Sequence, residues 1–176
     1  MVLRHYQKKQ KSPIQLPLIE EFFGCVQFVD ISGFTPLAEK LSEEGNKGME
    51  KLTSYLNDYF GKLITMITDH GGDVVKFAGD ALLAVWPTDK EEELPAMVLL
   101  SCQFAFNMQT ELHDLTVKEG GVLRVHSGIG VGRLWGLHVG GVNGKIEYLI
   151  AGEALDQMGA CEGSAAPGEV YISGEC

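Results

Sequence analysis

An aspartate that follows a long apolar run is the feature that most constrains how this chain can fold. Residues 22–30 read Phe-Phe-Gly-Cys-Val-Gln-Phe-Val-Asp, and Ser32 and Gly33 come shortly after them. Such a run predicts a buried strand that ends in a tight loop. A carboxylate at the end of a buried strand is costly unless it is paired or bound to a metal ion. We therefore expect Asp30 to have a partner that neutralises it.

Two further segments show clear periodicity. Apolar residues recur at steps of three and four over residues 48–70, which predicts a helix with one apolar stripe. The glycine pair that begins at Gly71 is suited to a left-handed cap at the end of this helix. Residues 73–77 and 81–86 are short runs of strand-forming residues, which predict a hairpin with Asp80 at its tip.

The second half of the chain predicts one more long helix and several strands. The helix follows three glutamates, and its stretch 96–106 is apolar nearly all round, so we expect it to be buried or shared with a partner. The remaining expected elements are a strand at 122–131, an Asn-Gly turn within 139–145, a strand at 146–151, a short helix from Glu153 and a strand at 169–172. This order favours an α+β sandwich with helices packed on a largely antiparallel sheet.

Charge narrows the range of partners. The 176 residues include 24 acids and 14 bases, a formal charge of -10, and 45% of them are apolar. That length and composition predict one domain with a real core. The acidic surplus argues against nucleic acid and anionic membranes, since both need a basic face. The first acid is Glu20, and four bases precede it, so we expect residues 1–20 to be a solvated basic extension.

The chain lacks the sequence signals of secretion and membrane insertion. No apolar run approaches the roughly eighteen residues of a membrane span, and no apolar run of signal-peptide length follows the basic start. The four cysteines form no CxxC pair, so reduced thiols are expected rather than a zinc or disulfide framework. We accordingly expect a cytoplasmic protein without a transmembrane segment.

Asp30 and Asp80 form the most specific candidate site. Each lies close to a glycine near the end of a predicted strand: Asp80 directly follows Gly79, and Asp30 precedes Gly33 by three residues. If the two strands are neighbours, the carboxylates converge on a site of hard oxygen ligands that suits Mg²⁺ or Mn²⁺. The alternative is that Asp30 caps the following turn and that Asp80 is an ordinary turn residue. Spacing alone leaves both interpretations open.

The residues after Asp30 could bind an anion. Ile31-Ser32-Gly33-Phe34-Thr35 forms a short loop before a helix, where backbone N–H groups and hydroxyls can face a phosphate. Beside a divalent cation, such a loop provides the arrangement that phosphoryl chemistry requires.

The motifs FVDISGFT and VVKFAGDALLAVW together resemble the class III nucleotidyl cyclase domain, and most closely the first catalytic half of the bicarbonate-responsive soluble adenylyl cyclases. The resemblance implies a ferredoxin-like α+β fold and head-to-tail pairing of two such domains around the nucleotide. It also implies a cyclase domain over residues 21–176 that stops short of the family's full length. The reaction implied is attack of the ribose 3′-hydroxyl on the α-phosphorus of ATP, which gives cyclic AMP and pyrophosphate.

The resemblance also implies roles for individual residues. Asp30 and Asp80, with the carbonyl of Ile31, would hold two Mg²⁺ or Mn²⁺ ions. The triphosphate would be contacted by Ser32, Gly33, Phe34 and Thr35. Arg124 would reach the terminal phosphates, and Lys76 would read adenine or, in the pocket related by pseudo-symmetry, bind bicarbonate.

Several positions depart from the family pattern. Self-sufficient domains have an Asn and, four residues later, an Arg that stabilise the transition state, but this chain has Asp156 and Ala160 there. The polar partner of the adenine-reading lysine falls at Leu149 or Ile150, and the arginine of the bicarbonate pocket falls at Gly159. A complementary second cyclase domain, in the same polypeptide or in a dimer, is therefore expected.

Three hypotheses follow from the sequence. The first is a metal-dependent adenylate cyclase domain that supplies the metal-binding half of a two-domain site. The second is a non-catalytic regulatory module that binds nucleotide or bicarbonate, which the missing Asn and Arg favour. The third is a dimerisation module, which the apolar helix at 96–106 suggests.

Overall fold

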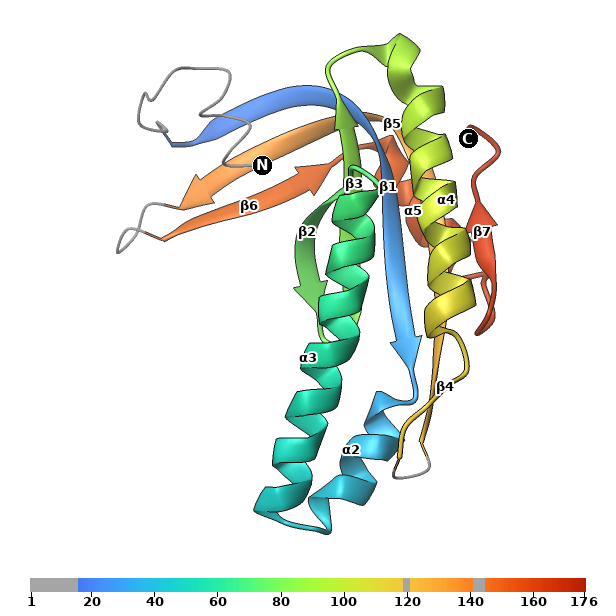
Figure 1. Ribbon diagram of the computed structural model, residues 1–176. Coiled ribbons are helices and arrows are strands. Elements are labelled where there is room, and N and C mark those ends of the chain that lie inside the picture. Colours follow the sequence, from blue (N-terminus) through green and yellow to red (C-terminus); the bar gives the residue numbers. More distant parts are fainter. Residues whose placement is uncertain (1–15, 119–120, 141–144) are drawn as a thin grey trace.

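The computed structural model describes residues 16–118, 121–140 and 145–176. Most of these residues belong to helices and strands that alternate along the chain (Figure 1). In order, the elements are β1 (Leu18–Ser32), α2 (Phe34–Ser42), α3 (Asn46–Asp69), β2 (Asp73–Ala78), β3 (Ala81–Thr88), a 3₁₀ turn (Glu91–Glu93), α4 (Leu94–Leu112), β4 (Leu115–Thr116), β5 (Val122–Gly140), β6 (Ile146–Ala151), α5 (Glu153–Glu162) and β7 (Val170–Ile172).

The strands form one sheet with β1 at its centre. The order is β2-β3-β1-β5-β4, and β6 and β7 also pair with β5. All pairings are antiparallel except that of β7 with β5. The prediction of a largely antiparallel α+β fold is therefore confirmed.

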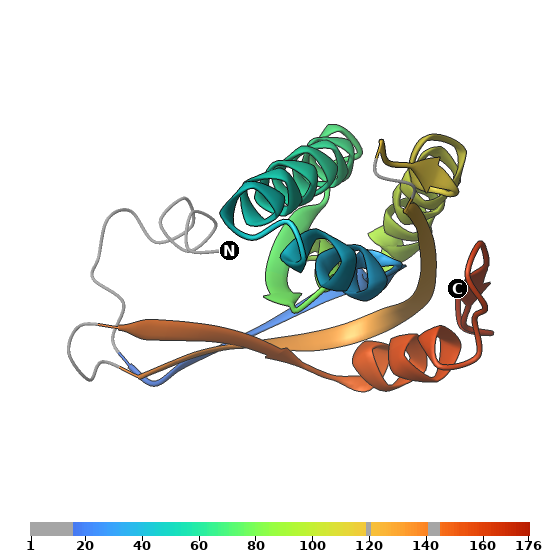
Figure 2. The ribbon, with the colours of Figure 1, turned by 90° about the horizontal axis from the view of Figure 1, so that it is seen from below.

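Alternation along β1 divides its side chains between two cores. Cys25, Val29 and Ile31 belong to the larger core, which β1 shares with α3 and α4. Phe22 and Val26 belong to a smaller core beneath α5. Figure 2 shows this layering, with α2, α3 and α4 on one side of the sheet and α5 on the other. Asp30 is in register with Phe22 and Val26, so it lies on the face that α5 covers.

Two glycines bring α5 against the backbone of β5. A Cβ atom at Gly128 would lie 2.3 Å from the backbone nitrogen of Glu162, and one at Gly130 would lie 2.1 Å from the carbonyl oxygen of Ala154. Neither distance leaves room for a side chain. The glycines therefore allow a close helix-to-sheet approach, which sets how near the end of α5 comes to the end of β1.

One polar network is buried between β1, β5 and α4. Gln27 Nε2 donates to Ser127 Oγ at 2.8 Å, and Ser101 Oγ donates to Gln27 Oε1 at 2.9 Å. All three side chains are fully buried. Because each is hydrogen-bonded, the network holds the register of the central strands at little cost.

The structure changes several expected boundaries. β1 runs from Leu18 to Ser32, so Asp30 lies within the strand and not at its end. β5 continues to Gly140, well beyond residue 131, because it pairs with β1 over its length and then with β6. The expected Asn-Gly turn, at Asn143 and Gly144, lies outside the described residues. Hairpin and helix positions otherwise agree with the prediction.

The helix α4 is less buried than its composition indicates. Phe104 and Met108 are fully buried, but Leu99 and Phe106 are 59% and 72% exposed. The sheet covers only one side of α4, so an all-round apolar sequence leaves part of the helix in solvent. Within the described ranges, none of the helices has the length and apolar character needed to cross a lipid bilayer.

Candidate active site

Asp30 and the turn that holds Asp80 are brought together by the pairing of β1 with β3. In the β1–β3 ladder Asp30 is opposite Ala81, the first residue of β3, and Asp80 directly precedes it in the β2–β3 turn. The condition that their strands be neighbours is therefore met. The charge of Asp80 is close enough to act on the pKa of Asp30.

The environment of Asp30 favours a bound cation. Burial raises the pKa of its carboxyl group above the usual 3.8, His126 opposes this shift, and the negative charges of Asp80 and Glu162 add to it. The Asp30 side chain remains 29% exposed, so solvent and ligands can reach it. The carboxylates of Asp80 and Glu162 both lie near enough to repel a negative charge on Asp30, and the opposing charge comes from His126. Such a set of oxygen ligands suits a divalent ion.

His126 and Glu162 also contact this site, and no local sequence signal indicated either of them. His126 is opposite Asp30 in the β1–β5 ladder, and its Nε2 lies 3.6 Å from Asp30 Oδ2. The same nitrogen lies 3.4 Å from Glu162 Oε1, at the last residue of α5. The three residues come from positions far apart in the sequence, and only the sheet register and the position of α5 join them.

The turn after β1 requires glycine. Gly33 has φ of 104°, and a Cβ there would lie 2.3 Å from the carbonyl oxygen of Val122. The helix α2 begins at the next residue, Phe34. Phe34 is 5% exposed, and its ring packs edge-on against Tyr59 in the core, so only its backbone can face a ligand. Thr35 is exposed.

Arg124 and Ser32 are direct neighbours across the β1–β5 ladder. Ser32 Oγ donates a long hydrogen bond of 3.5 Å to the carbonyl oxygen of Arg124. The Arg124 guanidinium donates through Nε to Asp114 Oδ1 at 2.7 Å. Asp114, which has an unusual positive φ of 53°, did not stand out in the sequence. The anion-binding candidates thus gather at one end of the sheet, with Arg124 held by a carboxylate.

Lys76 lies apart from the positions expected to complete base recognition. It is exposed on β2, at one edge of the sheet, opposite Leu83 of β3. Leu149 and Ile150 lie on β6, opposite the part of β5 that also pairs with the first residues of β1. One copy of the chain therefore does not bring these residues together.

The α5 positions that depart from the family pattern face solvent. Asp156, Gly159 and Ala160 are all exposed. Because Asp156 and Ala160 do not fill a core, packing does not explain why these residue types occur at the two positions.

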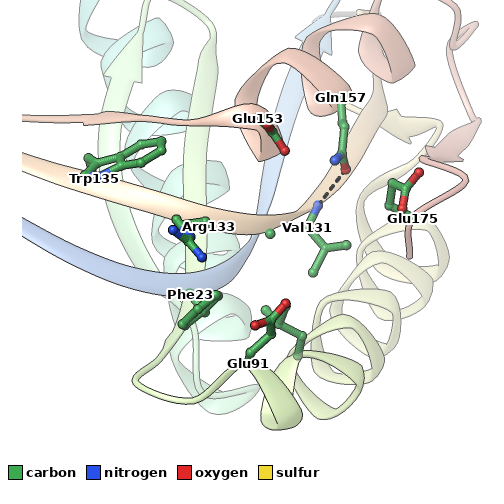
Figure 3. Close-up of a pocket in the computed structure, with 10 residues that line it drawn as sticks. Phe23, Glu91, Val131, Arg133, Trp135, Glu153, Gln157 and Glu175 are labelled. Carbon is green, nitrogen blue, oxygen red and sulfur yellow. Dashed lines mark hydrogen bonds between the residues drawn. The ribbon is translucent and has the colours of Figure 1, made fainter.

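A separate cavity lies away from these residues. It has a volume of about 720 Å³ and lies near the start of β1, where Phe23, Arg133 and Trp135 line it together with glutamates (Figure 3). Arg133 pairs with Glu21 at 3.2 Å and lies 5.7 Å from the centre of the Phe23 ring. Its lining contains neither Asp30 nor Asp80, so this cavity is separate from the candidate site.

The family model that matches this chain describes cyclases, and two of its sequence relatives are cyclases too. The adenylate and guanylate cyclase catalytic domain matches residues 23–176. Adenylate cyclase type 10 from rabbit, Oryctolagus cuniculus, is 32% identical over 169 residues, which cover 92% of this chain and 10% of that protein. The protein of the same name from Rattus norvegicus is 33% identical over 163 residues, 91% of this chain and 10% of the relative. The chain thus spans about a tenth of the length of these relatives.

Solved structures agree with the fold. The adenylyl cyclase CyaB from P. aeruginosa aligns with a TM-score of 0.64 and 25% identity over 90% of this chain and 80% of that one. The dimeric guanylyl cyclase domain of a fusion protein from the fungus Blastocladiella emersonii aligns with a TM-score of 0.69 and 20% identity, over 88% and 82% of the two chains. The second likeness supports the fold alone.

Proposed function

Because this chain belongs to the adenylate and guanylate cyclase catalytic domain family, we propose that it is the metal-binding half of an adenylate cyclase site that converts ATP to cyclic AMP and pyrophosphate. The observation that carries this proposal is the juxtaposition of Asp30 and the Asp80 turn at the end of β1, beside the Gly33 turn and Arg124. ATP is proposed over GTP because the relatives from rabbit and rat, at 32% and 33% identity, are adenylate cyclases.

The residues present fit two Mg²⁺ or Mn²⁺ ions. Asp30 and Asp80 offer adjacent carboxylates in a region short of positive charge. The carbonyl of Ile31 is the further proposed ligand. When bound, such ions lower the pKa of an attacking hydroxyl and neutralise phosphate charge.

The protein's own groups orient the triphosphate in this proposal. Ser32 and Thr35 offer hydroxyls, and the backbone N–H groups of Gly33 and Phe34 lie at the start of α2, where the helix dipole favours an anion. Arg124 supplies positive charge to the terminal phosphates after it leaves Asp114. Asp30 and Asp80 would hold the ions and do not act as nucleophiles, since the ribose hydroxyl is the attacking group.

A second cyclase domain completes the proposed site. Asp156 and Ala160 cannot replace the Asn and Arg that stabilise the transition state in self-sufficient domains. Lys76 also lies far from the β6 positions of its own chain, so its base-reading partner would come from another domain. We infer that the chain acts in a pair, with the partner in the same polypeptide or in a separate subunit.

The test is reconstitution with a cyclase domain that carries the Asn and the Arg. The mixture should form cyclic AMP from ATP in the presence of Mg²⁺ or Mn²⁺, and Asp80→Asn should reduce the rate on the order of 100-fold or more. Asp58→Asn, which removes an exposed carboxylate on α3, is the matched control. Cyclic GMP as the main product would overturn the choice of ATP, and no product from any such pair would overturn the enzyme proposal.

The alternative is a regulatory module that binds nucleotide or bicarbonate without turnover. Asp156 and Ala160 favour it, since they replace the Asn and the Arg of the transition-state pair, whereas Gly159, at the position of the bicarbonate-pocket arginine, favours nucleotide over bicarbonate as its ligand. It predicts that ATP with Mn²⁺ raises the melting temperature of the chain, and that no partner domain yields product. A cytoplasmic location fits either function.

A further inference from the structure

We propose that Asp30, His126 and Glu162 form a binding site for Zn²⁺ or a similar transition-metal ion, and that occupation of this site inhibits the cyclase by withdrawing Asp30 from the catalytic ions. The metal-binding part stands on the geometry of the three side chains. The inhibitory part rests on the proposed function.

The three side chains converge on one point. Their ligand atoms all lie within 4.8 Å of one another. His126 Nε2 is 3.4 Å from Glu162 Oε1 and 3.6 Å from Asp30 Oδ2. A tetrahedral zinc ion with bonds of about 2.0–2.1 Å separates its ligand atoms by about 3.3–3.4 Å. The two measured separations are close to the edges of such a tetrahedron.

The two contacts of His126 Nε2, with Asp30 and with Glu162, fit a bridging metal ion better than they fit direct hydrogen bonds. Both exceed the usual N–H···O distance of about 2.9–3.0 Å. His126 Nδ1 is buried and has no hydrogen-bond partner, and the side chain is only 12% exposed. If Nδ1 carries the proton, the lone pair of Nε2 faces two carboxylates. A cation placed between the three atoms would turn this repulsion into three favourable bonds.

The donor set selects the kind of metal. One imidazole nitrogen with two carboxylate oxygens suits Zn²⁺, whereas Mg²⁺ prefers oxygen ligands alone. Three protein ligands also leave a fourth position open, as in zinc sites that are accessible to solvent. Asp30 and Glu162 are 29% and 28% exposed, so an ion can enter from solvent.

The fold holds these ligands in place. His126 is fixed opposite Asp30 by the β1–β5 register. Glu162 is brought over β5 because α5 lies directly on Gly128, two residues after His126 on the same face. Asp30 is therefore shared between two neighbouring sets of ligands, with Asp80 in one and with His126 and Glu162 in the other.

Zinc binding is tested first on the chain alone, with affinity as the readout in place of cyclase activity. Zinc affinity is measured by competition with a chromophoric chelator in the 1–176 chain with Cys102, Cys161 and Cys176 changed to serine, so that accessible thiols do not contribute. His126→Ala should weaken zinc binding by about 100-fold. This is the upper end of the loss in metal affinity that follows mutation of groups that support a metal ligand. His126→Gln is measured beside it, and thermal unfolding confirms that both variants are folded. Asp58→Asn, which removes an exposed carboxylate on α3, is the control and should keep the parental zinc affinity.

Cobalt reports the ligand type directly. Co²⁺ is added to the same chain with the three serine substitutions. It should give the visible absorption bands of a tetrahedral site with nitrogen and oxygen ligands. These bands should be lost in His126→Ala and in Glu162→Gln. Equal zinc affinity in the parent and in folded His126 variants would overturn the site. An octahedral cobalt spectrum that does not change in either variant would also overturn it.

The inhibitory part is tested in the reconstituted cyclase, with each variant compared with its own rate without zinc. Half-inhibition should require at least about tenfold more Zn²⁺ in Glu162→Gln than in the parent. An unchanged zinc requirement would overturn the inhibition while leaving the site intact. If zinc binds as expected but no reconstituted pair makes cyclic AMP, the proposed function fails and the metal site stands.

Discussion

Arg124 donates a hydrogen bond of 2.7 Å through Nε to Oδ1 of Asp114, so a residue proposed to bind phosphate is held by a carboxylate in this structure. The two side chains are 49% and 58% exposed. An exposed pair of this kind contributes only about 0–1 kcal/mol to stability. The contact is therefore weak enough for a nucleotide to displace, and it sets a competition between Asp114 and phosphate for Arg124.

Removal of Asp114 should favour nucleotide binding. In Asp114→Asn we expect KM for ATP to fall a few-fold, on the order of 1 kcal/mol, because Arg124 no longer leaves an ion pair to reach phosphate. Steady-state kinetics of the reconstituted pair measure this. Glu44→Gln is the control, since it removes another exposed pair, with Lys51, at 2.8 Å. A raised KM in Asp114→Asn would show that Asp114 positions Arg124 and does not compete for it.

Two glycine substitutions should have opposite effects on stability. Gly128→Ala places a Cβ 2.3 Å from both Glu162 N and Met158 O, and overpacking of this kind costs about 1–3 kcal/mol. Gly159→Ala, within α5, meets nothing within 4 Å and should stabilise by about 0.4–1 kcal/mol. Urea unfolding of both variants gives the comparison. Equal free energies of unfolding for the two would mean that α5 does not pack on β5 as described.

Cysteine labelling should separate Cys25 from Cys176. Burial raises the pKa of the Cys25 thiol to about 12, so at pH 8 it is protonated as well as inaccessible. Because a thiol must ionise to react, Cys25 should stay unmodified by iodoacetamide while exposed Cys176 is alkylated. Peptide mapping by mass spectrometry identifies the sites. Modification of both at the same rate in the folded chain would contradict the buried core around β1.

A gain-of-function variant tests whether the chain lacks only the Asn and the Arg that stabilise the transition state. Asp156→Asn combined with Ala160→Arg should restore the transition-state groups on α5, and both positions are exposed, so the fold should tolerate them. We expect cyclic AMP formation by the chain alone to rise at least about tenfold, part of the 10²–10³-fold that one such donor provides. The single variant Asp156→Asn is the control. No increase would show that base recognition or pairing is also missing.

Local patterns were sufficient to predict much of the fold. The apolar run that ends at Asp30 predicted β1, and the positions of apolar residues over 48–70 predicted α3. The glycine before Asp80 marked a real turn, with φ of 68° at Gly79. These features depend on residues close in sequence, which is why they can be recognised without a structure.

The rest of the site depends on contacts between distant segments. His126 joins Asp30 because β5 pairs with β1 in one particular register, and Glu162 joins them because α5 reaches β5 at Gly128. Asp114 reaches Arg124 because β4 pairs with β5, with Leu115 opposite Leu123. None of these three residues belongs to a motif, so the sequence gives no spacing from which to find them. The length of β5 was missed for a related reason, since its glycines interrupt the alternation that marks a strand.

The central claim is that Asp30 and Asp80 act together as ligands of the catalytic ions. The most direct measurement is the rate of cyclic AMP formation by the reconstituted pair with Asp30→Asn, Asp80→Asn and both changes. If the two carboxylates act as one unit, each single variant should lose on the order of 100-fold or more, and the double variant should be little worse than either. Losses that multiply in the double variant, or single variants that keep the parental rate at saturating Mg²⁺, would contradict the account.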